Sequence, residues 1–367
     1  MHTKAPGRLQ RLFDTIYFPI ASILASFLVA GVAFKLLGFD PAVAFGGLLS
    51  GSVGSLNAWG ETLNKATPVI LTGLSYAIAQ RCGVINLGAE GQVYIGALCA
   101  VLVGTELSLP AALHIPVVLA AAFLGAALFG TLPAIMKNRF GSSELITTIM
   151  FNYVALYFVH YMIAGPIKDM NSGSNFAQSK QMLQTAQLPR LNAMFPGVTL
   201  PNRLHAGLIV AVLALIFYSF FLFRTTRGYE MRVIGLNRSA GECAGMNIRT
   251  NTLLSMFLAG GFAGLGGACE LMGVQRRIME NAFNGFGFDG VAVALLGGNS
   301  SGGIALSGIL FGALKSGATK MQMKSGVPTA TVYMLQGLII LFVVGKRLFD
   351  YHRITERRKT HHGKEND

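Results

Sequence analysis

The chain has 367 residues, of which 52% are hydrophobic and only 12% are charged. Soluble domains carry about 25% charged residues, so this composition, with a mean hydropathy of +0.54, excludes an ordinary water-soluble protein. The net charge of +13 would suit a nucleic-acid-binding protein. Here, however, the lysines and arginines cluster at the ends of apolar runs, which argues against nucleic acid as a partner.

Apolar runs recur almost to the end of the chain, and most have about the 20 residues that a helix needs to cross a bilayer. The first run follows three basic residues and is too long for the apolar core of a signal peptide, so we interpret it as a span. The sequence predicts an all-α, polytopic transmembrane helical bundle. Its roughly ten expected spans are 16–37, 63–82, 91–106, 112–136, 144–164, 204–223, 252–272, 286–300, 303–320 and 328–345.

The distribution of Lys and Arg indicates the orientation, because cytoplasmic segments carry an excess of both. We expect a basic cytoplasmic N-terminus at 1–15, a transmembrane domain at 16–345 and a basic cytoplasmic tail at 346–367. Within the domain, 165–203 is the longest outer loop, and the arginine-bearing segment 224–251 is a cytoplasmic loop. Both termini are then in the cytoplasm.

The spans also divide into five before the long outer loop and five after it. Two halves of opposite orientation would form the inverted repeat of many transporters. A short echo supports this 5+5 arrangement, because Glu90 follows the second span and Asp289 follows the seventh, each beside glycine. Chance similarity of two short stretches is the alternative.

The first segment that interrupts the apolar pattern is 82–92, where glycines surround Asn86, Glu90 and Gln92. Glycine opens the backbone and frees amides and carbonyls that need partners or water. A carboxylate costs about 2.5–3.5 kcal/mol at mid-depth in a bilayer, so it usually faces protein or an aqueous cavity. Two interpretations are open: a break that lines or gates a pathway, and an ordinary cytoplasmic turn.

A second acid, Asp289, heads the apolar stretch 291–298. An acid there complements the positive N-terminal end of a helix dipole, and helix capping alone would explain it. Phe286 and Phe288 stand beside it and could stack on a planar ligand. We favour a helix start that also lines a pathway.

Polar residues also occur in the fifth span. Ser143 suits a helix N-cap, and Asn152 lies in apolar sequence and needs a hydrogen-bond partner. Tyr153, Tyr157 and His160 or Tyr161 share one helical face. These polar side chains either make contacts between helices or form a surface that faces a solute.

The cytoplasmic loop 224–251 predicts two short helices broken at Gly235, with Asn237 capping the second helix and Gly245 ending it. A short helix on the inner face can lie in a groove of a partner and transmit its motion. A solvated loop with cytoplasmic arginines is the alternative.

The sequence predicts no enzyme. No phosphate-binding pattern surrounds Lys346, and no Ser/His/Asp or metal-ligand spacing is present. The four cysteines form no CxxC pair and read as small apolar residues. We therefore expect no catalytic residue, no metal and no cofactor bound by this chain.

Taken together, these segments resemble the permeases of bacterial nucleoside ABC importers, within the broader sugar and branched-chain amino-acid permease family. The resemblance extends from about residue 60 to 345, and the order and spacing of its motifs are more specific than any one of them. The matching stretches are Asn86–Gln92, Thr148–Tyr153, Gly235–Asn237, Ala244–Asn247 and Gly287–Gly297.

The resemblance implies a permease subunit in the bilayer of the bacterial plasma (inner) membrane that moves nucleosides inward. ATP would be hydrolysed by separate cytoplasmic ATP-binding subunits. An extracytoplasmic solute-binding protein would deliver the substrate, and a second permease subunit, expected to be a different chain, would complete the pathway.

The resemblance also guides the assignment of residues. Segment 224–251 matches the family segment that contacts the ATPase, so we assign this coupling to Gly235, Asn237, Glu242, Ala244 and Gly245. The residues assigned to the substrate pathway are Asn86, Glu90, Gln92, Asn152, Tyr153, Phe286, Phe288 and Asp289.

Three alternatives are open. The permease could carry simple sugars or branched-chain amino acids. An ion-coupled secondary transporter would need a titratable residue deep in the pathway, for which Glu90 is the leading candidate. A membrane receptor or scaffold would bind a partner other than an ATPase through the cytoplasmic loop.

Overall fold

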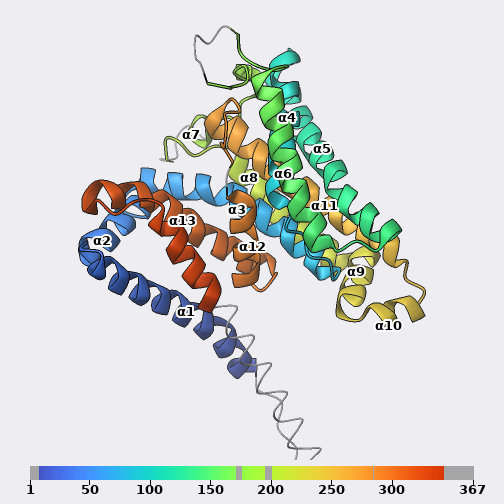
Figure 1. Cartoon of the computed structure of the whole chain (residues 1–367), viewed down its shortest axis with the longest axis horizontal. Coiled ribbons are helices and arrows are strands. Elements are labelled where there is room, and N and C mark those ends of the chain that lie inside the picture. The colour runs from blue at the N-terminus through green and yellow to red at the C-terminus, as the bar shows by residue number, and fades with distance from the viewer. Residues whose placement is uncertain (1–7, 171–175, 195–200, 284, 343–367) are drawn as a thin grey trace, which may run out of the picture. The chain divides into compact units, whose positions relative to one another are not determined.

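The computed structural model describes residues 8–170, 176–194, 201–283 and 285–342, with side chains from residue 21 onward. Within these ranges the regular elements are helices, joined by loops that contain three isolated β-bridges, so the all-α prediction is confirmed. The elements, shown in Figure 1, are α1 (Arg8–Leu36), α2 (Pro41–Ser52), α3 (Leu56–Arg81), α4 (Ala89–Glu106), α5 (Ala111–Phe140), α6 (Glu144–Ala164), η1 (Gln184–Ala186), α7 (Leu191–Met194), α8 (Gly207–Arg224), α9 (Thr226–Leu236), α10 (Arg238–Cys243), α11 (Ile248–Glu270), the π-helix η2 (Leu271–Gln275), α12 (Phe286–Leu296), α13 (Ser301–Ser325) and a last helix at Thr331–Phe342.

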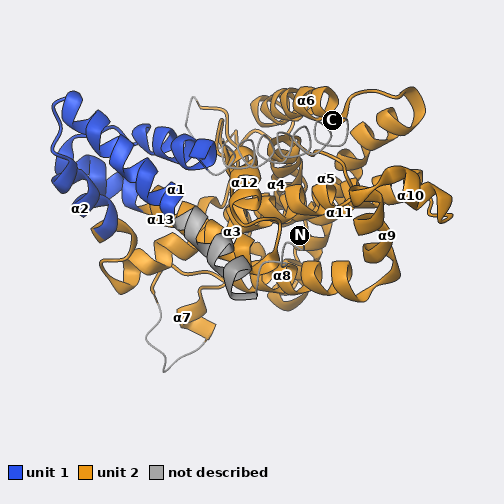
Figure 2. Ribbon diagram, turned by 90° about the horizontal axis from the view of Figure 1, so that it is seen from below, with its two compact units in different colours: residues 1–49, 317–367 blue, residues 50–316 orange. Residues whose placement is uncertain are grey.

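The chain forms two compact units, coloured separately in Figure 2. Residues 1–49 and 317–367 make one unit. In it, the centroid of the Phe45 ring lies 5.3 Å from that of Phe27 and 5.6 Å from that of Phe34. Residues 50–316 make the other, which holds all the candidate site residues. The basic tail expected at 346–367 and the first seven residues of the expected N-terminal segment lie outside the described residues.

Helix α11 is the central helix of unit 50–316 and packs against α3, α4 and α5. Small residues make this packing close, because a Cβ on Gly96 would overlap the backbone of Gly264. Likewise, a Cβ on Gly260 would overlap the backbone of Ala126. The glycines at these positions therefore serve packing within the chain.

Among the residues that the structure describes, four helical segments are long and apolar enough to cross a membrane: α5, α6, α8 and the continuous stretch Ile248–Gln275. A polytopic membrane protein is thus confirmed at this coarser level. The span expected at 286–300 is shorter than predicted, because α12 ends at Leu296. Its 11 residues extend only about 16 Å, half the hydrocarbon thickness of a bilayer.

Candidate functional site

The site is built around the N-terminus of α12, which Glu90 caps from the first turn of α4. Oε1 of Glu90 accepts a hydrogen bond from the backbone N–H of Gly285, and Oε2 accepts one from Gly287, both at 2.6 Å. The first N–H groups of a helix have no partner within the helix and carry partial positive charge. The buried carboxylate supplies both the hydrogen bonds and the opposite charge.

Glycine is required at two positions of this contact. Gly285 precedes the helix with φ of +87°, a left-handed conformation that favours glycine. A Cβ on Gly287 would overlap the backbone of Glu90. The glycines of 285–290 therefore let α12 begin in direct contact with α4.

Asp289 lies in the first turn of α12 and forms an ion pair with Lys315 of α13. The ammonium of Lys315 also lies 4.4 Å from the centre of the Phe286 ring, a cation–π geometry. Oγ1 of Thr72 in α3 donates a hydrogen bond of 2.9 Å to the carbonyl of Phe286. The start of α12 is thus held from α3, α4 and α13 together.

Asn86 anchors the non-helical stretch between α3 and α4 and is completely buried. Its Nδ2 donates to Oγ of Ser75 at 3.1 Å and to Oε1 of Gln92 at 3.0 Å. Its Oδ1 accepts from the backbone N–H of Gly88 at 3.0 Å. The polar side chains of this break thus satisfy one another and the backbone.

Asn152 of α6 completes the polar network. Its Oδ1 accepts from the N–H of Gly91, and its Nδ2 donates to the carbonyl of Leu87, both at 2.8 Å. Both polar groups of the Asn152 side chain therefore bond to the backbone around the break between α3 and α4. The observed contacts are those of a link between helices.

These contacts show where the break lies. Asn86 bonds to Ser75, and Thr72 bonds to the residue that begins α12. At 1.5 Å per residue these partners lie about 9 and 13 Å along α3 from its end at Arg81. The chain therefore returns beside α3 after its turn at 82–83, and whether the stretch 82–92 lines a pathway stays a prediction.

The aromatic candidates divide by exposure. Phe286 is buried, whereas the side chains of Phe288 and Tyr153 are 54% exposed. Tyr157 and Tyr161 are exposed on α6 as well, and Nδ1 of His160 lies 3.7 Å from Glu280. The tyrosine stripe lies on the surface of α6 while Asn152 points inward, and a pathway role for Tyr153 and Phe288 stays a prediction.

Segment 224–251, which we expect to be a cytoplasmic loop, contains two short helices, as predicted. Oδ1 of Asn237 accepts from the N–H of Ala240 at 3.1 Å and caps α10, and Gly245 has φ of +76° after it. The helices break at Asn237 and not at Gly235, which is a correction. Gly235 is still helical, and its missing side chain permits contact with the backbone of Arg81.

The loop presents an exposed surface on a fixed base. Glu242, Ala244 and Gly245 are exposed around the end of α10. Beneath them, Met231 and Ile234 of α9 pack with Cys82 and Ile248 in one buried cluster. Helix α9 is therefore fastened to the end of α3 and the start of α11.

A hydrogen bond also joins α9 to α11. Oε2 of Glu230 accepts from Nδ2 of Asn251 at 2.8 Å and from Arg227 at 3.0 Å. The Asn251 hydrogen bond, with the Arg227 contacts, holds the pKa of Glu230 below its ordinary value. This carboxylate is therefore ionised at neutral pH.

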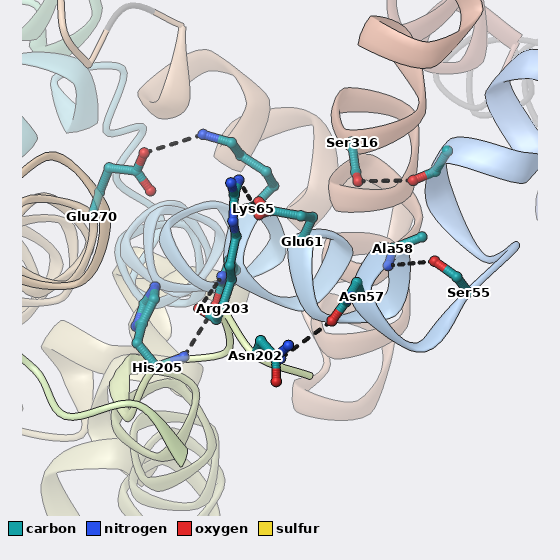
Figure 3. A network of polar contacts seen from close by, with 12 residues as sticks. Ser55, Asn57, Ala58, Glu61, Lys65, Asn202, Arg203, His205, Glu270 and Ser316 are labelled. Atoms are coloured by element: carbon teal, nitrogen blue, oxygen red, sulfur yellow. Dashed lines mark hydrogen bonds and ion pairs between the residues drawn. The ribbon is translucent and has the colours of Figure 1, made fainter. Parts of the chain in front are cut away.

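Sequence reasoning missed several polar partners. Lys315 is one, although a lone lysine in an apolar helix is itself a signal of function. A second polar network, drawn in Figure 3, joins α3, the chain around 201–205 and the end of α11. Its side chains include Glu61, Asn64, Lys65, Arg203, His205 and Glu270.

The structure also has a groove of about 530 Å³ between α8 and the start of α13. Ile216, Phe220 and Arg224 line it on one side, and Gly302 and Ala305 line it on the other. None of the candidate site residues lines this groove. Within the described residues, no cluster of His, Cys, Asp or Glu could hold a metal ion.

Apolar helices with buried acids at backbone breaks define a polytopic membrane protein of the transporter class. The chain belongs to the family described as "Branched-chain amino acid transport system / permease component", whose profile matches residues 58–344. It is thus a permease subunit of an ABC importer, without an ATPase domain of its own.

Curated relatives are similar over nearly their whole length. The guanosine ABC transporter permease protein NupP of Bacillus subtilis is 39% identical, over 89% of this chain and 92% of the relative. The nucleoside ABC transporter permease protein NupB of Lactococcus lactis is 34% identical, over 91% and 92%. The glucose ABC transporter permease protein TsgB13 of Haloferax volcanii is also 34% identical, over 92% and 89%. No solved structure is significantly similar to the chain.

Proposed function

We propose that this permease imports nucleosides. The observation that carries the proposal is the 39% identity to a guanosine permease across nearly the whole of both chains. A glucose permease at 34% identity favours a simple sugar as the second candidate. A binding protein encoded beside this gene would present either solute at the outer face.

We propose about ten spans in a 5+5 inverted repeat, in the bacterial inner membrane and with both termini in the cytoplasm. The proposed parts are the N-terminus 1–15, the permease domain 16–345, its outer loop 165–203, its coupling loop 224–251 and the tail 346–367. The half-length α12 supports this arrangement, because transporters commonly build their sites from discontinuous helices.

The C-terminal end of α12 is tied to the end of α3. The carbonyl of Asn299, just after α12, accepts from Arg81 at 2.9 Å and from Tyr218 at 2.8 Å. With the end of α3 on the inner side, as proposed, α12 would rise from that side and its capped N-terminus would lie about 16 Å deeper. We propose that Glu90 and Asp289 brace or line the pathway at this depth, together with Asn86, Gln92 and Asn152.

A chain of backbone contacts connects this site to the coupling loop. Gly235 in α9 touches the backbone of Arg81 and Gly83, and the latter begins the stretch that Asn86 anchors. We propose that ATPase motion received by α10 passes through α9 to this stretch. Because Glu90 joins the stretch to α12, the same motion would shift α12 and open the inner end of the pathway.

The partners follow from this mechanism. Two cytoplasmic ATP-binding subunits would hydrolyse ATP against the exposed end of α10. An extracytoplasmic binding protein would dock on the outer side, and a second permease of different sequence would provide the other half of the pathway. The test of this composition is purification of the assembled transporter with the neighbouring gene products.

The test of function is uptake into proteoliposomes that contain the assembled transporter, with labelled guanosine or glucose carried by its binding protein. We expect guanosine uptake that requires ATP on the ATPase side. Glucose uptake without guanosine uptake would select the second candidate. Uptake driven by a proton gradient without ATP would contradict the ABC mechanism.

A further inference from the structure

We propose that Lys65, Glu270 and His205 form a hydrogen-bonding site for the sugar hydroxyls of the transported solute, near the outer end of the bundle. This inference rests on the proposed function and adds the residues that recognise the solute. Figure 3 shows the three side chains at the junction of α3, α11 and the chain that leads into α8.

The site lies far from the coupling loop. Arg81 and Ile248 mark the ends of α3 and α11 that meet α9. Counted from these ends at 1.5 Å per residue, Lys65 lies about 24 Å and Glu270 about 33 Å along its helix. With the coupling loop in the cytoplasm, the pair belongs to the outer half of the bundle.

Glu270 has an unused acceptor. Its Oε1 pairs with the ammonium of Lys65 at 3.2 Å, while Oε2 has no hydrogen-bond partner in the described part of the chain. The side chain is only 2% exposed, and a buried unpaired carboxylate oxygen is costly. The π-helix η2 begins directly after Glu270, and such bulges are frequent at functional sites.

His205 provides a donor beside the same bulge. Its ring packs so closely on Gly273 in η2 that a Cβ there would lie 2.6 Å from it. Nδ1 accepts a hydrogen bond from the N–H of Gly207 at 3.1 Å, which places the proton of the neutral ring on Nε2. Nε2 is buried and without a partner among the described residues.

Access is from the side of Lys65, whose side chain is 33% exposed. The backbone of His205 is held by α3, because Oδ1 of Asn64 accepts from the backbone N–H of His205 at 3.4 Å. A solute arriving along Lys65 would thus meet an ammonium donor, a carboxylate acceptor and an imidazole donor. All three are held by the packing of neighbouring helices.

Sugar hydroxyls match this set, since each hydroxyl both donates and accepts a hydrogen bond. One hydroxyl can donate to Oε2 of Glu270 and accept from Nε2–H of His205, and its neighbour can accept from Lys65. Ribose in a nucleoside and a free simple sugar share this chemistry. Branched-chain amino acids carry no hydroxyl, and the nucleoside and glucose permeases among the relatives favour a hydroxylated solute here.

The test uses the whole reconstituted transporter with its binding protein saturated by guanosine, by 2′,3′-dideoxyguanosine or by glucose. Glu270→Gln removes the charge at constant size. We expect it to lower the uptake efficiency for guanosine on the order of tenfold while changing dideoxyguanosine uptake little, because only guanosine uses the carboxylate. His205→Ala should act in the same direction. If Glu270→Gln instead lowered the uptake of glucose about tenfold, a free sugar would be the ligand.

Glu61→Gln is the matched control, since Glu61 belongs to the same network but pairs with exposed Arg203 at 3.1 Å. It should leave both uptake rates nearly unchanged. The double variant Lys65→Glu with Glu270→Lys restores an ion pair in reverse. Recovery of normal guanosine uptake in the double variant would overturn the proposal and leave the pair a structural link. An equal loss of guanosine and dideoxyguanosine uptake in Glu270→Gln would overturn it in the same way.

Two readouts separate this proposal from the proposed function. Co-purification with the ATPase and the amount of protein in the membrane report whether each variant assembles. Uptake by the unchanged protein reports whether hydroxylated solutes are carried at all. Normal transport with unaltered discrimination in Glu270→Gln would overturn the recognition site alone.

Discussion

Glu90 and Gly287 share a hydrogen bond of 2.6 Å that joins the first turn of α4 to the first turn of α12. They are 197 residues apart in the chain, and the contact depends on the side chain of one and on the absence of a side chain in the other. The carboxylate satisfies the N–H groups of a helix that begins inside the bundle, and the glycine gives the carboxylate room to approach. Breaking this contact separates the two discontinuous segments on which the proposed mechanism depends.

Glu90→Ala should destabilise the start of α12, because two buried N–H groups lose their acceptor. Loss of a helix cap costs about 0.5–2 kcal/mol, so we expect a lower midpoint in thermal unfolding of the purified protein and reduced uptake. Glu106→Ala is the control, since Glu106 forms only an exposed pair with Lys180. Equal midpoints in the two variants would contradict the capping role.

Gly287→Ala should destabilise the fold more than the addition of one methyl group suggests. The added Cβ would overlap the backbone of Glu90, which cannot move without displacing α4. The comparison is Gly302→Ala in α13, where a Cβ meets nothing within 4 Å and alanine favours the helix. We expect loss of folded protein for the first variant and unchanged or slightly higher thermal stability for the second.

Gly245→Pro should abolish association with the ATPase and uptake, while insertion in the membrane is retained. The observed φ of +76° is closed to proline, so the end of α10 must rearrange. Gly141→Pro makes the same change at the end of α5, where φ is +69°. If Gly245→Pro still pulled down the ATPase as the unchanged protein does, α10 would not be the coupling element.

The Glu230 carboxylate should make stability depend on pH. Its pKa is lower in the folded protein, chiefly through the Asn251 hydrogen bond, so its contribution is present above its ordinary pKa of 4.5 and is lost as pH falls through the lower folded value. We expect Glu230→Gln to reduce thermal stability at pH 7 and to reduce it much less near pH 3. A difference that stayed constant with pH would contradict an ionised role.

Thiol labelling tests the orientation without any substitution. Cys243 in α10 is exposed, whereas Cys82 and Cys269 are buried. A membrane-impermeant thiol reagent should label Cys243 in inside-out vesicles and not in intact cells. Labelling from outside the cell would place the coupling loop on the wrong side and overturn the proposed mechanism.

Much of the fold could be predicted because it depends on local patterns. Apolar length gave the positions of α5, α6 and α8, and Asn237 and Gly245 marked the limits of α10 through their own backbone preferences. Helix α2 lies between the first two expected spans and was not predicted. Local chemistry likewise suggested that Asn86, Glu90 and Asn152 needed buried partners.

The sequence by itself determined the class of protein, since the cost of placing charges and free backbone groups in lipid leaves few arrangements for such a composition. Only the tertiary structure decided which groups meet. Glu90 bonds to Gly287, Asp289 to Lys315 and Lys65 to Glu270, each across long distances in the chain. No local pattern encodes these pairs, because they arise where glycine-lined helices pack closely enough for separate breaks in the backbone to satisfy one another.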